Sequence, residues 1–166
     1  LYITMEMAEE RIAERIDANL MNIPIMDLKE MSKPMFQDRI GLLKDKFEGR
    51  LIVKEYPTAS AHAGHFKALL NELKLKRNFH PNIIFIDYLN ICSSSRFRPG
   101  SSANSYTIIK SIAEELRGLA VEQDVPIVSA TQTTRGGYDN SDISLTDTSE
   151  SFGLPATADL MFAIIS

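Results

Sequence analysis

The chain has 166 residues, of which 44% are hydrophobic and 24% are charged, a balance typical of a folded globular domain. The formal net charge of −4 gives no overall attraction for nucleic acid, so a polyanion would have to meet a local basic patch. No apolar run approaches the roughly 20 residues that span a bilayer. The single cysteine excludes an intrachain disulfide and a multi-cysteine metal site, and it fits a reducing, cytoplasmic setting.

Short apolar runs alternate with helical patterns along the chain. Residues spaced three and four apart predict helices over 6–20, 65–77 and 105–123. The apolar runs, each a predicted strand, cover residues 1–5, 51–56, 83–87, 126–132 and 160–165. This alternation predicts an α/β fold in which helices cover both faces of a mostly parallel sheet. The uninterrupted apolar residues 83–86 predict a strand that is buried on both faces.

Polar residues that follow predicted strands are the first candidate site, because ligands of parallel sheets bind beyond the carboxyl ends of the strands. Glu6 follows the first run, where a carboxylate can orient the water that attacks a γ-phosphate. Asp87 ends the third run in the position of a Walker B carboxylate, which holds Mg²⁺ mainly through water. Gln132 ends the fourth run, where its amide can contact a terminal phosphate.

Each of these residues also has a plainer interpretation. Glu6 can be an acid favoured by the dipole in the first turn of a helix. Asp87 can cap a turn at a strand end. The pattern alone does not favour the Walker B role of Asp87 over this capping role. Gln132 can hydrogen-bond an exposed strand end. Taken singly, Glu6 and Gln132 favour the plainer interpretation.

Two long loops follow predicted strands, over 93–104 and 133–157, and long loops in compact domains are more often functional than idle. The first carries Arg96 and Arg98 on either side of an aromatic residue in a serine-rich, flexible setting. Two guanidinium groups with an aromatic ring suit single-stranded nucleic acid; a solvated loop with incidental arginines is the alternative. A second basic cluster is better explained as cations at the carboxyl end of a helix: Lys74, Lys76 and Arg77.

The phosphate-binding pattern G-x-x-x-x-G-K-[ST] does not occur in the chain. The chain also opens with Leu1-Tyr2-Ile3 rather than with methionine. We therefore expect it to be a piece of a longer protein, and we expect residues 1–166 alone not to hydrolyse ATP.

Several segments, taken in order, indicate one family. Thr4-Met5-Glu6-Met7 resembles the segment after the second strand of the DnaB-type hexameric replicative DNA helicases, and Ile86-Asp87-Tyr88-Leu89 resembles their Walker B strand. Residues 128–135 resemble their strand that ends in Gln and is soon followed by Arg. The sequences of residues 104–122 and 146–161 are similar to those of the T-even-phage members of the family. The similarity to the family is weaker over residues 21–50.

The resemblance implies a RecA-like ATPase core, of which residues 1–166 form a single partial domain that starts after the Walker A loop and ends before the arginine finger. It implies a 5′-3′ replicative helicase that uses ATP and Mg²⁺ and encloses single-stranded DNA as a homohexamer. Primase and a helicase loader are the implied partners, with no membrane association. The implied location is the bacterial cytoplasm, that of the host if a phage encodes the protein.

The resemblance also assigns residues by position. Glu6 and Gln132 take catalytic roles, Asp87 serves Mg²⁺, and Asp87, Gln132 and Arg135 contact the nucleotide. Ser149, Glu150 and Ser151 fall where the family contacts the DNA backbone, although Ser149 stands where an Arg is usual. Because loop 133–157 is acidic, any DNA contact there should use backbone amides or hydroxyls.

Two other functions remain compatible with the same motifs. One is a different RecA-like ATPase, such as a recombinase, which would form filaments on DNA. The other is a degenerate binding module that keeps the fold without turnover. Residues beyond the two ends of this chain would discriminate among the three.

Overall fold

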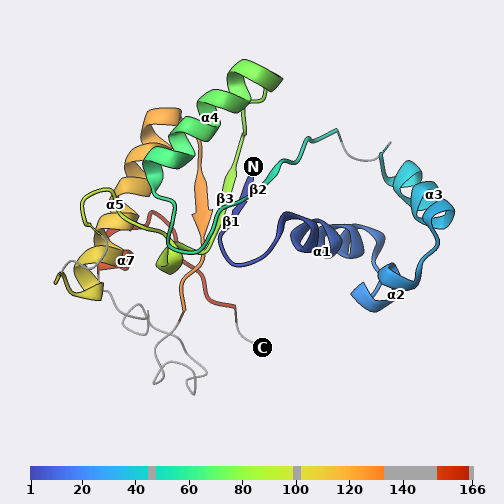
Figure 1. Cartoon of the computed structure of the whole chain (residues 1–166), viewed down its shortest axis with the longest axis horizontal. Coiled ribbons are helices and arrows are strands. Elements are labelled where there is room, and N and C mark those ends of the chain that lie inside the picture. The colour runs from blue at the N-terminus through green and yellow to red at the C-terminus, as the bar shows by residue number, and fades with distance from the viewer. Residues whose placement is uncertain (45–47, 99–101, 133–152, 165–166) are drawn as a thin grey trace.

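The computed structural model describes residues 1–44, 48–98, 102–132 and 153–164. These ranges contain a four-stranded sheet in the order β2-β1-β3-β4, and all neighbouring strands are parallel (Figure 1). The strands are β1 (Tyr2–Thr4), β2 (Val53–Glu55), β3 (Ile84–Asp87) and β4 (Ile127–Ser129). Thr4 lies opposite both Glu55 and Asp87, and Ile86 lies opposite Ser129. The carboxyl ends of all four strands therefore meet at one edge.

Helices lie on both sides of this sheet, as the sequence predicts. Figure 1 shows α4 (Ala63–Arg77) and α5 (Ser105–Gln123) together on one side, and α1 (Glu9–Met21) on the other. From α1 the chain continues away from the sheet through α2 (Ile25–Glu30) and α3 (Lys33–Lys44), which bury no side chain. The 3₁₀ helix η1 (Leu89–Ile91) follows β3, and α7 (Gly153–Thr157) packs against α5. None of the helices described is long and apolar enough to cross a membrane.

Local sequence sets the ends of the two helices that cover the core. The side-chain oxygen of Asn104 accepts a hydrogen bond from the Thr107 amide at 2.9 Å and so caps the start of α5. Asp124 ends α5 with a φ of 51°, and Asn78 ends α4 with a φ of 46°. Short polar side chains tolerate this left-handed conformation better than other non-glycine residues do.

The hydrophobic core lies between the sheet and the pair α4 and α5. Ile3, Ile84 and Phe66 are fully enclosed, and each such side chain contributes about 1.5–3 kcal/mol through burial. The helical stripes predicted from the sequence supply most of the remaining core. Their buried members are Phe66, Leu69, Leu70 and Leu73 on α4 and Ile109, Ile112, Ala113 and Leu116 on α5.

Three sequence predictions are wrong. The run 160–165 does not form a strand over its described residues 160–164, because none of the four strands described pairs with it, and Phe162 is 76% exposed. Strand β3 is not buried on both faces: Phe85 is 38% exposed, since the helix described on that side, α1, packs against β2 instead. The predicted loop 133–157 ends in helix α7 rather than in irregular chain.

Candidate functional site

Hydrogen bonds join the segments that follow the strands into one continuous edge. The segment after β2 pairs with the segment after β3, since the Ala59 amide donates to the Ile91 carbonyl at 3.0 Å and the Ser93 amide donates to the Ala61 carbonyl at 2.8 Å. The Leu89 amide donates to the carbonyl of Ala130, which follows β4. The backbone that carries the polar side chains of this edge is therefore held in place.

Glu6 lies on a tight turn at the carboxyl end of β1. The buried Thr4 hydroxyl accepts from the Met7 amide at 3.0 Å, which closes the turn around Glu6. The Met5 amide donates to the Asp87 carbonyl at 3.1 Å, and the Met5 carbonyl accepts from the Thr58 hydroxyl at 2.6 Å. These bonds hold the backbone of the turn against β2 and β3, and the Glu6 side chain is exposed at its outer side.

Asp87 ends β3 with a half-buried side chain that a tyrosine orients. The Tyr2 hydroxyl donates to Asp87 Oδ2 at 2.9 Å. Burial, this hydrogen bond and the negative charge of Asp87 raise the pKa of Tyr2 to about 12, so Tyr2 stays a neutral donor. The peptide bond between Asp87 and Tyr88 is cis.

A carboxylate oxygen at this position fits a hard cation such as Mg²⁺. Among the described residues, no group of three or more His, Cys, Asp or Glu side chains gathers into a metal site. A cation held by Asp87 would therefore keep most of its ligands as water or take them from phosphate oxygens.

The side chain of Gln132 contacts Tyr88, the residue that follows Asp87. Its Nε2 donates to the Tyr88 hydroxyl at 3.4 Å, a long contact, and the neighbouring Thr131 hydroxyl donates to Asn90 Oδ1 at 2.8 Å. The structure thus brings Gln132 and Asp87 together through Tyr88. The other residues predicted for the fourth strand end and the following loop lie outside the described residues: Arg135, Ser149, Glu150 and Ser151.

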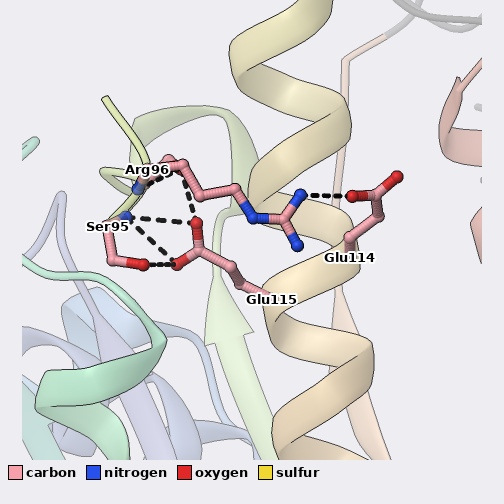
Figure 2. Close-up of polar contacts among 5 residues, drawn as sticks. Ser95, Arg96, Glu114 and Glu115 are labelled. Atoms are coloured by element: carbon pink, nitrogen blue, oxygen red, sulfur yellow. Dashed lines mark hydrogen bonds and ion pairs between the residues drawn. The ribbon is translucent and has the colours of Figure 1, made fainter.

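The loop 93–104 carries Arg96 and Arg98 and is called the arginine loop below. Side chains of its described first part, residues 93–98, contact helix α5 (Figure 2). Glu115 accepts hydrogen bonds from the Ser94 hydroxyl at 2.5 Å and from the amide and hydroxyl of Ser95 at 3.0–3.1 Å. Arg96 forms an ion pair with Glu114 at 2.5 Å. Arg98 is exposed. The flexible setting predicted for Arg96 is therefore replaced by an anchored one.

The hydrogen bonds to Glu115 favour its charged form. Partial burial opposes the charge of this carboxyl, but the bonds from Ser94 and Ser95 and the nearby charge of Arg96 outweigh it. The pKa of Glu115 consequently lies below its ordinary value. Sequence reasoning missed both glutamates, because nothing in the local pattern of α5 distinguishes them from solvated acids on a helix.

Comparison with known proteins gives a consistent set of relatives. A family model described as the DnaB-like helicase C-terminal domain matches residues 1–165. The chain is 51% identical over 168 residues to the DnaB-like replicative helicase of Enterobacteria phage T4, an alignment that covers 99% of this chain and 35% of that protein. It is 29% identical to a probable plasmid replicative DNA helicase of Chlamydia muridarum, over 98% of this chain and 35% of the relative. The chain thus spans about a third of the length of these curated relatives.

Solved structures confirm the fold class. A structure described as a DnaB-like replicative helicase and its interactions with primase superposes with a TM-score of 0.71 at 19% identity, covering 95% of this chain and 38% of that one. A second solved structure, described as an ATPase domain, also gives 0.71, at 18% identity, covering 95% of this chain and 56% of that one. The RecA-like sheet flanked by helices that the sequence predicts is therefore the fold of this chain.

Proposed function

Because this chain belongs to the DnaB-like helicase C-terminal domain family, we propose that it is part of the ATP-driven motor of a replicative DNA helicase. The observation that carries the proposal is the edge at which Asp87 ends β3 while Glu6 and Gln132 come shortly after the parallel strands β1 and β4. The 51% identity to a phage replicative helicase favours this function over a recombinase or a scaffold. The proposal extends to 5′-3′ movement on single-stranded DNA and unwinding at the fork.

Each edge residue has a role that its position supports. Glu6, exposed on a fixed turn, orients the water that attacks the γ-phosphate and accepts its proton. Asp87, oriented by Tyr2, holds Mg²⁺ through water. Bound Mg²⁺ neutralises charge on the phosphate oxygens. Gln132, next to Tyr88, contacts the terminal phosphate, with Arg135 beyond it in sequence.

The assembly and partners belong to the same proposal. We propose that the full protein forms a homohexameric ring around single-stranded DNA in the cytoplasm of a bacterial host. One structural relative is described together with primase, which supports primase as a partner, and a helicase loader is expected from the family resemblance. Arg96 and Arg98 contact the DNA from the loop after β3, and residues 149–151, which follow β4 in the sequence, contact it as well.

The test uses the full-length protein with three single substitutions. Glu6→Gln should abolish most ATP hydrolysis while nucleotide binding persists, because the amide cannot accept the proton of water. Asp87→Asn should weaken Mg²⁺-dependent nucleotide binding and hydrolysis together. Glu10→Gln is the matched control, since it removes another exposed carboxylate four residues further along, in the first turn of α1.

The outcomes separate the candidate functions. Hydrolysis by the Glu6→Gln protein at the wild-type rate would contradict the assignment of the base. A wild-type protein that binds single-stranded DNA but never hydrolyses ATP would favour a binding module. Filaments rather than closed rings on DNA in electron micrographs would favour a recombinase.

A further inference from the structure

The two arginines of the loop after β3 are not equivalent. Arg96 has its guanidinium group in an ion pair with Glu114 of α5, and its backbone amide donates to the Ser94 hydroxyl at 3.2 Å. Arg98, two residues further, forms no ion pair within the described part of the chain. One arginine is therefore engaged by an internal carboxylate, and the other is exposed to solvent.

The adjacent glutamates of α5 hold this loop in different ways. Glu115 receives four hydrogen bonds from Ser94 and Ser95, two of them from a single backbone amide, and is half-buried. Glu114 makes one ion pair, between side chains that are 38% exposed for Glu114 and 52% exposed for Arg96. The first set of contacts fixes the backbone of the turn. The second is a solvent-accessible contact that another anion can replace.

We propose that Glu115 is a positioning residue that anchors the DNA-binding turn 94–96 on α5. In the same proposal, Glu114 forms an ion pair with Arg96 until a DNA phosphate displaces the Glu114 carboxylate. The proposal rests on the proposed function, in which this loop contacts single-stranded DNA. A carboxylate and a phosphate offer the same planar fork of a guanidinium group similar pairs of acceptor oxygens. Because Glu114 is an internal competitor, it weakens DNA binding, whereas Glu115 strengthens it by holding the turn in place.

The size of the competition follows from the exposure of the pair. Ion pairs between exposed side chains are typically worth about 0.2–1 kcal/mol, which corresponds to a change in affinity of about 1.5- to 5-fold. Removing the Glu114 charge should tighten DNA binding by this factor. Removing the Glu115 side chain should weaken DNA binding, because Ser94 and Ser95 lose their common acceptor and the turn must be ordered on binding.

The experiment measures binding of a fluorescein-labelled oligothymidylate to the full-length protein by anisotropy, with a non-hydrolysable ATP analogue and Mg²⁺ present. Glu114→Gln keeps the shape of the side chain and removes its charge. The matched control is Glu122→Gln, about two turns further along α5, where the carboxylate pairs with Lys67 instead of the loop. We expect Glu114→Gln to bind about 1.5- to 5-fold more tightly and Glu122→Gln to bind like the wild type.

A second readout separates positioning from general damage to the fold. The DNA concentration that half-maximally stimulates ATP hydrolysis should fall for Glu114→Gln and rise for Glu115→Ala, and Glu115→Asp should restore part of the loss. If the substitutions of Glu114 and Glu115 merely disturbed α5, both would shift this concentration in the same direction. On an Arg96→Ala background, Glu114→Gln should have no further effect, because the two residues act through one contact.

Several results would overturn the inference. Equal tightening by Glu114→Gln and Glu122→Gln would show a general effect of net charge. Persistence of the Glu114→Gln effect in the Arg96→Ala background would show that Glu114 acts on DNA without Arg96. If Arg96→Ala weakens DNA binding and Glu114→Gln changes nothing, the inference fails while the proposed function stands. If the wild-type protein binds no single-stranded DNA, both fail together.

Discussion

The cap of helix α4 should make the stability of this domain depend on pH between about 5 and 7, the range in which histidine titrates. His62 precedes the helix, and its Nδ1 accepts a hydrogen bond from the Gly64 amide at 3.0 Å. Its own amide donates to Nδ1 of His65 at 3.2 Å, and the two rings lie 4.1 Å apart. Each bond needs a ring nitrogen with a free lone pair, so protonation of His62 at Nδ1 breaks the bond that it accepts from Gly64.

The direction of the effect follows from the pKa of His62. Burial and, to a smaller extent, the charge of His65 lower this pKa, against a weaker opposing contribution from Glu115. A histidine with a lowered pKa in the folded state binds protons less readily than in the unfolded chain. Its contribution to stability is therefore fully present above the ordinary pKa of 6.5 and is lost as the pH falls through the lowered value.

The magnitude is that of one helix cap. Losing a good N-cap side chain costs about 0.5–2 kcal/mol, typically about 1 kcal/mol. Protonation of His62 removes its acceptor, so we expect a loss of about 1 kcal/mol in the free energy of unfolding. Gly64 is part of this arrangement, because a Cβ atom there would lie 2.8 Å from Cε1 of His62. Gly64→Ala should therefore displace the ring and cause a similar loss at neutral pH.

The assay is urea denaturation of the wild type and of His62→Asn at a series of pH values. Asparagine is a good N-cap that does not titrate, so the variant keeps a cap and loses the pH-dependent element. On going from about pH 7.5 to pH 5, the wild type should lose about 1 kcal/mol relative to His62→Asn. Other groups titrate in both proteins and cancel in the difference. Identical pH dependence in the two proteins would refute this account of the cap.

Three further predictions use other parts of the structure. Phe66→Ala should lower the free energy of unfolding by about 3–5 kcal/mol in urea denaturation, because Phe66 is fully enclosed in the core; a loss below about 1 kcal/mol would contradict its place there. Tyr2→Phe should remove one tyrosinate step near pH 12, and with it the loss of stability expected as the pH rises from 10 to that value; loss of a step near pH 10 instead would contradict the raised pKa of Tyr2. Replacing Arg96 and Arg98 together by alanine should reduce the slope of log affinity against log salt by about 0.7 per lost phosphate contact. An unchanged slope would place the DNA contact elsewhere.

The fold and the strand-end residues could be predicted because both depend on short-range patterns. A helical period identified the buried stripes of α4 and α5, and apolar runs identified four parallel strands. Once a parallel sheet is expected, the residues after its strands must share an edge, which is why Glu6, Asp87 and Gln132 could be grouped before any contact was seen. Their chemical roles remain predictions, which the Glu6→Gln and Asp87→Asn substitutions test.

Features that depend on a partner element could not be predicted. Residues 160–164 have the composition of a strand, yet a strand forms only where another backbone accepts its hydrogen bonds. Phe85 belongs to an apolar run, yet its exposure depends on whether a helix covers that face of the sheet. Glu114 and Glu115 look like any solvated acids, and only the return of residues 94–96 against α5 gives them a role.

The contacts around β3 fix the connection between Asp87 and the arginine loop along its length. Leu89 is bonded to the segment after β4, and Ser93 is bonded to the segment after β2. At the far end, Glu115 holds the turn at Ser94. These bonds hold the backbone between Asp87 and Arg96 in a fixed position relative to the neighbouring segments. Among the contacts of this loop with α5, the ion pair between Arg96 and Glu114 is therefore the one that we expect a DNA phosphate to replace, because both side chains are partly exposed and exposed ion pairs contribute little.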